Sequence, residues 1–204
     1  MKSLVISPTF NEKKNIQELI HRISGLNHSL DILIIDDNSP DGTATIIKEL
    51  MIQNQHIHLI ERKSKMGLGT AYCRGFQWAL ERDYDYIIQM DADLSHPPEA
   101  ILQMLKLLSK HDVIVGSRYV MDGEVDSDWG FIRKIVSSMG NFFGKSIVGL
   151  NPTDVTSGFK AYKLSVLKKI PSFCNFQQYS VVLRKNLKVA LSRDLSLPEP
   201  IWGH

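Results

Sequence analysis

The sequence has few cysteines, no long apolar run and no excess of charge of one sign. Its 2 cysteines, Cys73 and Cys174, lie far apart without metal-ligand spacing, so neither a disulfide framework nor a zinc site is expected, and a reducing compartment fits best. No stretch reaches the roughly 18 apolar residues of a membrane span, and the N-terminus turns polar too soon for a secretory signal. We expect a protein that is soluble or peripheral to a membrane.

Nucleic acid is not an expected partner. The 24 basic and 22 acidic residues give a formal charge of +2, and the lysines and arginines form no long run. The sequence also lacks internal repeats, low-complexity segments and Pro/Gly/Ser-rich linkers, and its 204 residues are 43% hydrophobic. These features are typical of one globular domain. An acidic stretch at residues 121–128 reads as an exposed loop.

Short apolar runs alternate with helical patterns through the first two thirds of the chain. Because the runs are nearly all apolar, they predict an α/β fold with a mainly parallel sheet covered by helices on both faces. Ligands of such sheets bind at the carboxyl ends of the strands. The expected strands are 4–6, 32–35, 57–60, 85–90 and 113–116, and the expected helices lie within 16–23, 46–51, 70–82 and 98–109.

Three polar motifs follow expected strands and should meet at that edge of the sheet. They are residues 8–15, 36–43 and 91–93. In the third, alternation along an extended chain points Asp91 and Asp93 to the same side. Two such carboxylates are suited to Mg²⁺ or Mn²⁺ bound to a diphosphate, although a solvated turn is the alternative for an isolated Asp-x-Asp.

Other polar residues near this edge allow two interpretations each. Asp37 is a candidate acceptor for a nucleobase or ribose, whereas Asp41 fits turn and helix-cap chemistry at least as well. Glu12 either binds ribose or favours the positive end of a helix beginning near Lys13. The glycine-containing loop 65–71 is a weak candidate for a phosphate cradle and otherwise a tight turn.

Basic residues in the second half suggest a phosphate site. Arg118 follows the strand that ends at Gly116 and would reach the same edge as the aspartates. Arg133 and Ser137 are four residues apart, so on a helix they share a face that either grips a phosphate or is simply solvated. The apolar stripe at 131–150 indicates a helix that lies in a membrane interface or packs on the sheet.

Taken together, these motifs resemble those of the inverting family 2 glycosyltransferases, and within them the polyprenol-phosphate (dolichyl-phosphate) mannosyltransferases. The resemblance runs in order from residue 3 to about residue 171. The motif at 91–99, the Gly-Ser-Arg-Tyr run and the Arg133/Ser137 pair are the more specific parts. The motifs that carry it lie at residues 8–15, 36–43, 65–72, 91–99, 116–120 and 156–162.

The resemblance implies a nucleotide-diphospho-sugar transferase (glycosyltransferase-A) fold that moves mannose from GDP-mannose to a polyprenyl phosphate. Phe10 stands where relatives usually have tyrosine, which keeps stacking area but removes a hydroxyl. The residues that would line the nucleotide pocket are Pro8, Phe10, Glu12, Ile35 and Asp37.

For the diphosphate and its Mg²⁺ or Mn²⁺, the resemblance implies contacts from Asp91, Ala92 and Asp93, with Ser95 nearby as a further metal contact. Ser95 stands where some relatives have glutamine. The catalytic roles would fall to Asp93 and to Arg118, which would also contact the donor.

The lipid phosphate acceptor would be held by Arg118, Arg133 and Ser137. Because a phosphate monoester has a second pKa of about 6, it is already an anionic nucleophile near neutral pH and needs no general base. Attack opposite the leaving diphosphate would invert the anomeric centre. Such an enzyme is expected in the cytoplasm, peripheral at the cytoplasmic face of a membrane.

The expected domain is a catalytic domain at 1–171 with an atypical or truncated C-terminal tail at 172–204. Relatives continue into a basic loop that closes over the donor, and the tail has no recognisable equivalent. Two alternatives therefore stay open. One is a catalytically impaired sugar-nucleotide-binding module, and the other is a related transferase that uses UDP-glucose or another nucleotide sugar.

Overall fold

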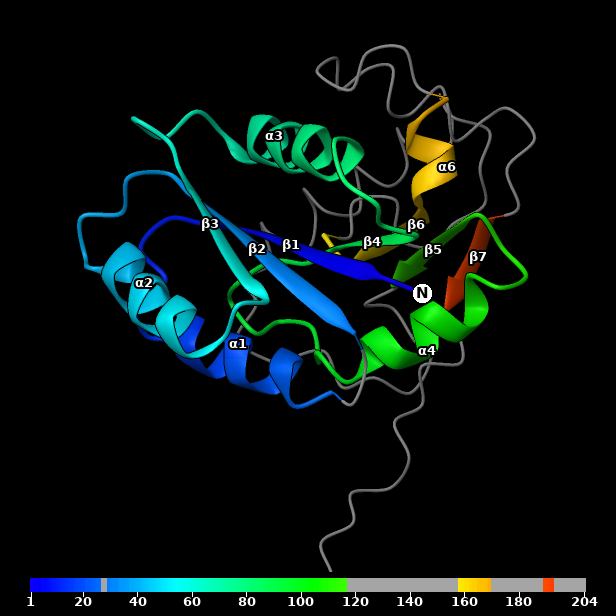
Figure 1. Cartoon of the computed structure of the whole chain (residues 1–204), viewed down its shortest axis with the longest axis horizontal. Helices are drawn as coiled ribbons and strands as arrows, with labels where there is room; N and C mark the ends of the chain where they lie inside the picture. The colour runs from blue at the N-terminus through cyan, green and yellow to red at the C-terminus, as the bar shows by residue number, and fades with distance from the viewer. Residues whose placement is uncertain (27–28, 117–157, 170–188, 193–204) are drawn as a thin grey trace, which may run out of the picture.

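The computed structural model describes residues 1–26, 29–116, 158–169 and 189–192, and these build a twisted α/β sandwich around one sheet (Figure 1). The sheet has seven strands in the order β3-β2-β1-β4-β6-β5-β7. All neighbouring pairs are parallel except those that β6 makes with β4 and β5. The strands are β1 (Ser3–Thr9), β2 (Leu30–Asp36), β3 (Ile57–Glu61), β4 (Tyr86–Gln89), β5 (Val113–Gly116), β6 (Lys160–Lys163) and β7 (Val189–Ser192).

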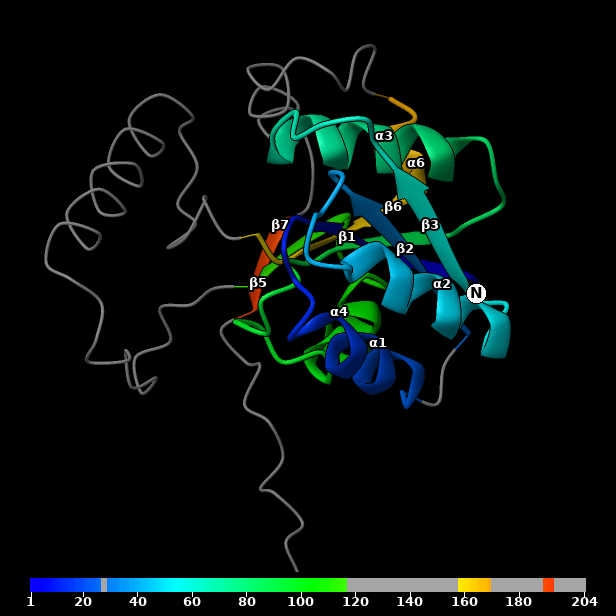
Figure 2. The same ribbon diagram turned by 90° about the vertical axis from the view of Figure 1, so that its left-hand side faces the viewer.

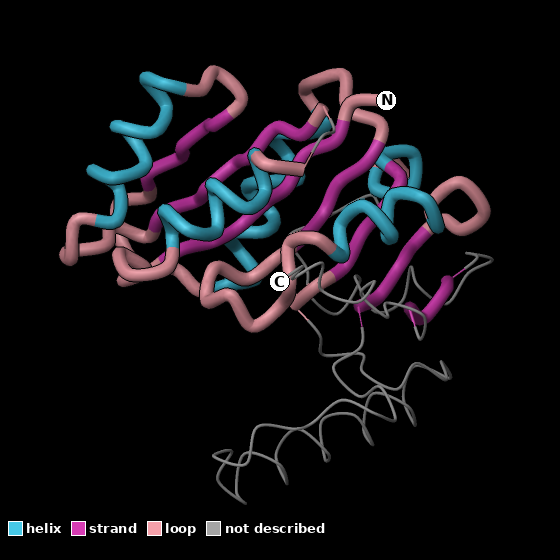
Figure 3. The backbone as a smooth tube through the Cα atoms, turned by 90° about the horizontal axis from the view of Figure 1, so that it is seen from below, coloured by secondary structure: helices cyan, strands magenta, loops and turns pink. Residues whose placement is uncertain are grey.

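Helices cover both faces of the sheet, as the apolar strands predict. Figures 1 and 2 show α1 (Ile16–Ser24), α2 (Thr43–Gln53) and α4 (Ala100–Leu107) on one face. The helices α3 (Leu68–Leu80) and α6 (Leu164–Leu167) lie on the other. Seen from below, the strands lie side by side behind the first group of helices (Figure 3).

Alternation along the strands divides the core into two layers. In β1, Val5 belongs to the cluster that packs on α1, α2 and α4, whereas Leu4 and Ile6 belong to the cluster under α3 and α6. In β2, Ile34 and Ile35 divide in the same way. Because apolar residues face both layers, these strands carry no polar side and were recognisable as buried.

The predicted strands and helices of the first 116 residues are confirmed, but three later elements were not predicted. The strand β6 lies antiparallel between β4 and β5, and it is followed directly by the short helix α6; β7 lies at the edge beside β5. Lysines flank the two buried residues of β6, so the segment lacks an apolar run long enough to indicate a strand.

The remaining sequence predictions fall outside the described residues. They concern the acidic loop at 121–128, the apolar stripe at 131–150, Arg118, Arg133, Ser137 and most of the tail at 172–204. Within the part of the chain that the structure describes, none of the helices has the length and hydrophobicity needed to cross a membrane.

Candidate functional site

The loop after β4 carries the two predicted metal-binding aspartates. The strand ends at Gln89, although the Met90 amide still donates to the Ile6 carbonyl at 3.1 Å. Ala92 is 3% exposed, while Asp91 is half-buried and Asp93 is exposed, which is the alternation that the sequence predicts. A turn then follows immediately.

That turn is fixed by its own backbone. Leu94 has a φ of 61°, in the left-handed region that an L-residue adopts only where the chain must reverse sharply. The Ser95 amide donates to the Asp93 Oδ1 at 3.0 Å, and the Ser95 side chain is exposed. The turn therefore holds Ser95 against Asp93 at the carboxyl edge, two residues after Asp91.

Asp91 has different neighbours at its two carboxylate oxygens. The Tyr72 hydroxyl of α3 donates to Oδ1 at 2.9 Å, and it is the one hydrogen-bond donor to Asp91 among the residues described. On the other side lies Gly158, where an added Cβ atom would stand 2.0 Å from Oδ2. Only glycine lets the backbone approach the carboxylate this closely.

This arrangement fits a divalent cation. Asp91 and Asp93 supply carboxylate oxygens, which Mg²⁺ binds at roughly 2.1 Å. Within the described ranges no group of three or more His, Cys, Asp or Glu side chains is placed to hold a metal. A pair of aspartates is nevertheless sufficient for Mg²⁺ or Mn²⁺, because such ions keep waters and take further oxygens from substrate phosphates.

Aromatic packing anchors the loop to β6. The His96 ring stacks on Phe159 with centroids 5.2 Å apart and an angle of 22° between the planes, and both side chains are buried. Gly116 at the end of β5 lies against the same Phe159 ring, since a Cβ atom there would stand 2.6 Å from its Cδ1. The His96 imidazole therefore packs on the buried side of the loop, although Asp93 and Ser95, which precede it in the sequence, are exposed.

Asp37 lies buried at the end of β2 and is held by a fork of donors. Both of its oxygens accept hydrogen bonds from Arg62, which follows β3, and the Met66 amide adds one to Oδ2 at 3.2 Å. Arg62 also donates to the Thr70 hydroxyl at 2.7 Å and to the Gly67 carbonyl at 3.2 Å. Arg62 thus connects Asp37, the predicted nucleotide contact, to the glycine loop.

The glycine loop itself forms the turn into α3. Gly67 has a φ of 93°, a conformation that side chains rarely adopt, and α3 begins at the next residue. The Lys65 ammonium lies 4.1 Å from the centroid of the half-buried Phe10 ring. This loop therefore borders the predicted nucleotide pocket from the β3 side.

The β1 and β2 loops are tied to each other by turn and cap chemistry. The amides of Asn11 and Lys13 donate to the Ser39 hydroxyl and to Asp41, each at 3.0 Å. Asp41 also accepts from the Thr43 amide and hydroxyl, which is turn chemistry just before α2, whose N-cap residue is Gly42. Although burial alone would raise the pKa of Asp41, these hydrogen bonds lower it below the usual range.

The other predicted pocket residues lie at the same edge with different exposures. Glu12 accepts a hydrogen bond from the Asn15 side chain at 2.9 Å, and its carbonyl accepts from the first turn of α1. Pro8 is half-buried at the end of β1. Ile35 is 0% exposed, and its side chain packs in the core under α3.

Four neighbours of the predicted site were not recognised from the sequence: Tyr72, Gln89, Gly158 and Arg62. Tyr72 and Gly158 lie within the motifs at 65–72 and 156–162, so the resemblance marked both segments without giving their roles. Their contacts with Asp91 join α3 and the start of β6 to the loop after β4. Such long-range pairs cannot be read from local spacing.

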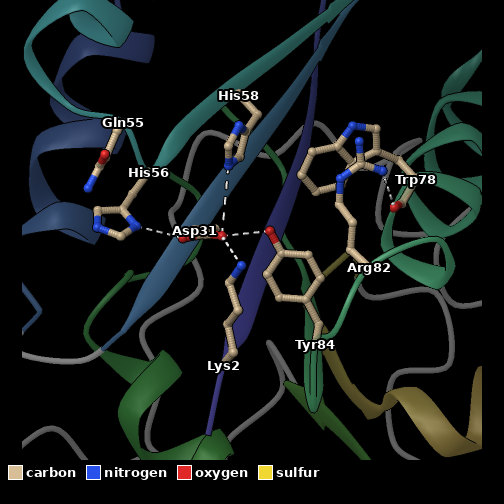
Figure 4. Close-up of a pocket in the computed structure, with 8 residues that line it drawn as sticks. All are labelled: Lys2, Asp31, Gln55, His56, His58, Trp78, Arg82 and Tyr84. Atoms are coloured by element: carbon tan, nitrogen blue, oxygen red, sulfur yellow. Dashed lines mark hydrogen bonds and ion pairs between the residues drawn. The ribbon is translucent and has the colours of Figure 1, made fainter.

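A second aspartate cluster occupies the opposite edge of the sheet, where the strands begin. Asp31 of β2 lies 5% exposed at the base of an open pocket of about 480 Å³ (Figure 4). It accepts from the Tyr84 hydroxyl at 2.6 Å, from His56 Nδ1 at 2.7 Å and from Lys2 Nζ at 3.2 Å. His58 Nε2 lies 3.8 Å away.

These donors decide the charge of Asp31. Burial alone would raise the pKa of Asp31, but the hydrogen bonds from Tyr84, His56 and Lys2 outweigh burial and lower it. Burial and the neighbouring carboxylate raise the pKa of the Tyr84 hydroxyl well above its usual value, so it stays a donor. Burial also lowers the pKa of His58, against the attraction of Asp31.

Comparison with known families identifies the chain. The glycosyl transferase family 2 model matches residues 4–171. The chain belongs to glycosyl transferase family 2. The family and the catalytic fold predicted from the motifs are therefore confirmed, and the match ends where the predicted tail begins.

Curated relatives of this family 2 chain are 37 to 39% identical to it over the aligned residues. Polyprenol monophosphomannose synthase of Mycolicibacterium smegmatis is 39% identical over 171 residues, which cover 83% of this chain and 64% of that protein. Undecaprenyl-phosphate mannosyltransferase of Micrococcus luteus is 38% identical, with 83% and 70% covered. Dolichol-phosphate mannosyltransferase of Pyrococcus furiosus is 37% identical, with 83% and 48% covered. The chain thus spans between 48% and 70% of the length of these relatives.

Solved structures share the fold at lower identity. The mannosyltransferase PcManGT of Pyrobaculum calidifontis, solved with GDP-Man and Mn²⁺, superposes with a TM-score of 0.68 at 16% identity, covering 98% of this chain and 58% of that one. TarS of S. aureus with UDP-GlcNAc gives a TM-score of 0.63 at 17% identity, covering 95% and 56%. These neighbours establish the glycosyltransferase-A fold.

Proposed function

We propose that this family 2 glycosyltransferase moves mannose from GDP-mannose to a polyprenyl phosphate, with inversion at the anomeric carbon. One observation carries the proposal: Asp91 and Asp93 follow β4 at the carboxyl edge of the sheet, where Tyr72 and Gly158 fix the Asp91 carboxylate. The names of the three curated relatives, all polyprenol- or dolichol-phosphate mannosyltransferases or synthases, support mannose and a lipid phosphate.

Asp91 and Asp93 would hold Mg²⁺ or Mn²⁺, with the exposed Ser95 beside them. When bound, the metal would neutralise charge on the leaving diphosphate. Mn²⁺ is the ion in the solved GDP-Man complex of PcManGT, so we propose it as the first ion to test. A third acidic side chain is not required, because oxygens of the diphosphate would complete the coordination of the metal ion.

The nucleotide would bind across the ends of β1 and β2. Phe10 offers a ring for stacking, and Pro8 and Glu12 line the same loop, with Ile35 beneath them. Asp37 would accept from the base or ribose while Arg62 holds its carboxylate in place. Nucleotide entry would require Lys65 to leave the Phe10 ring, which it covers at 4.1 Å.

The acceptor phosphate would be gripped by Arg118, Arg133 and Ser137, and no general base is assigned. Near neutral pH the phosphate monoester is already an anion, so the residues have only to bring two like-charged substrates into line. In this proposal Arg118 contacts both substrates. Asp93 serves the transfer by holding the donor diphosphate through the metal.

A lipid acceptor places the reaction at a membrane surface. We propose that the protein binds the cytoplasmic face peripherally, through the apolar stripe at 131–150. Flotation with liposomes that contain polyprenyl phosphate tests this contact. If all the protein stays at the bottom of the gradient and none floats with the liposomes, the proposed membrane contact is contradicted.

The transfer itself is tested with radiolabelled GDP-mannose, polyprenyl phosphate and Mn²⁺. We expect label in the lipid fraction from the wild type and none from Asp91→Asn. Parallel reactions with UDP-glucose and UDP-GlcNAc test the alternative donors. A folded sample that binds GDP in a metal-dependent way but transfers no sugar would instead identify an impaired sugar-nucleotide-binding module.

A further inference from the structure

A chain of buried hydrogen bonds leads from β6 to Asp91. The Tyr162 hydroxyl of β6 donates to Gln89 Oε1 of β4 at 3.2 Å. The Gln89 side chain in turn hydrogen-bonds to Tyr72, whose hydroxyl donates to Asp91 Oδ1 at 2.9 Å. Tyr162, Gln89 and Tyr72 are 2%, 8% and 5% exposed, so solvent does not compete for these bonds.

The donors and acceptors in this chain of hydrogen bonds follow one order, from Tyr162 towards Asp91. Since Gln89 accepts from Tyr162 with its oxygen, its amide group is the part that faces Tyr72 as a donor. The Tyr72 oxygen therefore accepts from Gln89, and its single proton is directed at Asp91.

From this geometry we infer that Tyr72 is a positioning residue for the donor site: its hydroxyl fixes Asp91 Oδ1 and thereby sets the orientation in which the carboxylate would meet the divalent cation. The inference rests on the metal-dependent donor binding proposed above. Two segments fix the carboxylate: α3 supplies the hydroxyl, and Gly158, two residues before β6, packs closely against the carboxylate oxygens.

The opposite edge of the sheet offers a matched control. Tyr84 also donates its hydroxyl to a carboxylate, at 2.6 Å from Asp31 Oδ2, and both tyrosines are 5% exposed. Tyr72→Phe and Tyr84→Phe therefore remove the same group from two equally buried tyrosines. A purely structural role for Tyr72 predicts that the two variants behave alike.

The experiment measures GDP affinity by titration calorimetry, once in Mn²⁺ and once in EDTA, for each variant. The ratio of the two affinities isolates the metal-dependent part of binding. We expect Tyr72→Phe to lower this ratio about tenfold, as the loss of a partner behind a metal ligand does, with the EDTA arm unchanged. Tyr84→Phe should keep the wild-type ratio while lowering the melting temperature, and Tyr162→Phe should give a smaller loss than Tyr72→Phe.

The inference is overturned if Tyr72→Phe keeps the wild-type ratio, if Tyr84→Phe lowers the ratio equally, or if Mn²⁺ does not strengthen GDP binding to the wild type. The mannosyl-transfer assay separates this result from the proposed function. A protein that transfers no mannose but loses metal-dependent GDP binding in Tyr72→Phe would refute the transfer and support the role of Tyr72.

Discussion

The two edges of the sheet each carry an aspartate beside a buried tyrosine hydroxyl, yet the two carboxylates differ in how fully they are bonded. Asp31, where the strands begin, accepts from Tyr84, His56 and Lys2. Asp91, where β4 ends, accepts from Tyr72, and its second oxygen lies beside Gly158. A carboxylate that is saturated by protein donors stabilises the fold, whereas one that keeps an open oxygen can bind a ligand.

Asp37 sharpens this comparison because it lies at the functional edge but is saturated. Arg62 and the Met66 amide occupy its oxygens, so its position alone does not make it a metal ligand. Location at the carboxyl edge therefore identifies candidate ligand-binding aspartates. The number of protein donors to each carboxylate then distinguishes a cation ligand from a residue that contacts the nucleotide.

The largest effect is expected at the unsaturated carboxylate. Asp91→Asn removes the charge that holds the cation, and we expect transfer to fall about a thousandfold, in line with the loss of a direct contact that stabilises developing charge. The melting temperature should change little, since one hydrogen bond holds this side chain. Initial rates with labelled GDP-mannose and a thermal melt check both; a variant of wild-type activity would contradict the assignment.

The next largest effect is expected from filling the space before Asp91. In Gly158→Ala the new methyl group would stand 2.0 Å from Oδ2, so the carboxylate must move. Displacement of a group that positions the donor should slow transfer about a hundredfold. Single-turnover rates measure this loss, and Gly25→Ala, whose Cβ would meet its nearest atom at 3.4 Å, is the matched control that should keep normal activity.

The saturated carboxylate should show the reverse behaviour. Asp31→Asn leaves the buried Tyr84 hydroxyl and the Lys2 ammonium without their charged acceptor, which should lower the free energy of unfolding by about 2 kcal/mol. Urea denaturation measures this change. GDP affinity in Mn²⁺ should stay at the wild-type value, and a parallel loss of nucleotide binding would mean that the two edges are not independent.

A smaller effect is expected at Asp37. Arg62→Lys keeps the charge but loses the planar fork that holds both oxygens, and we expect GDP affinity to fall about tenfold through a less fixed Asp37. Because Asp37 is not a cation ligand in this account, the loss should be the same in Mn²⁺ and in EDTA. A loss confined to the Mn²⁺ arm would assign Asp37 to the metal instead.

The smallest effect is a pH dependence of stability from Asp31. Its pKa is lowered in the folded state, so its stabilisation is complete above the unfolded aspartate pKa of about 3.9 and is lost as the pH falls through the lower folded value. The difference in unfolding free energy between wild type and Asp31→Asn should therefore shrink below pH 4, by at most about 1.4 kcal/mol per pH unit. Urea titrations at several pH values measure it; a difference that grows towards acid would have the wrong sign.

Much of this arrangement was predictable from local patterns. The apolar runs of β1, β2 and β4 indicated buried parallel strands, and the polar motifs after them indicated which edge binds ligands. Alternation along the extended chain also predicted that Asp91 and Asp93 point to the same side, with Ala92 facing away. These features depend on spacing of two or three residues, which the sequence displays directly.

Other parts depended on contacts between distant segments. No sequence neighbour of Asp31 distinguishes it from a metal-binding aspartate, because the groups that donate hydrogen bonds to it come from the residues before β1, β3 and β4. Tyr72 and Gly158 likewise reach Asp91 only after α3 and β6 have packed on either side of β4. The antiparallel β6 was missed because two buried residues between lysines give no periodic signal.

The most direct test of the account is the anomalous scattering of Mn²⁺ in crystals grown with GDP-mannose. We predict a peak about 2.1 Å from Asp91 Oδ2, with Asp93 and the diphosphate completing the oxygen ligands, and no peak in the pocket beside Asp31. A well-ordered donor whose diphosphate binds without Mn²⁺ at Asp91, or a Mn²⁺ peak at Asp31, would contradict the central claim.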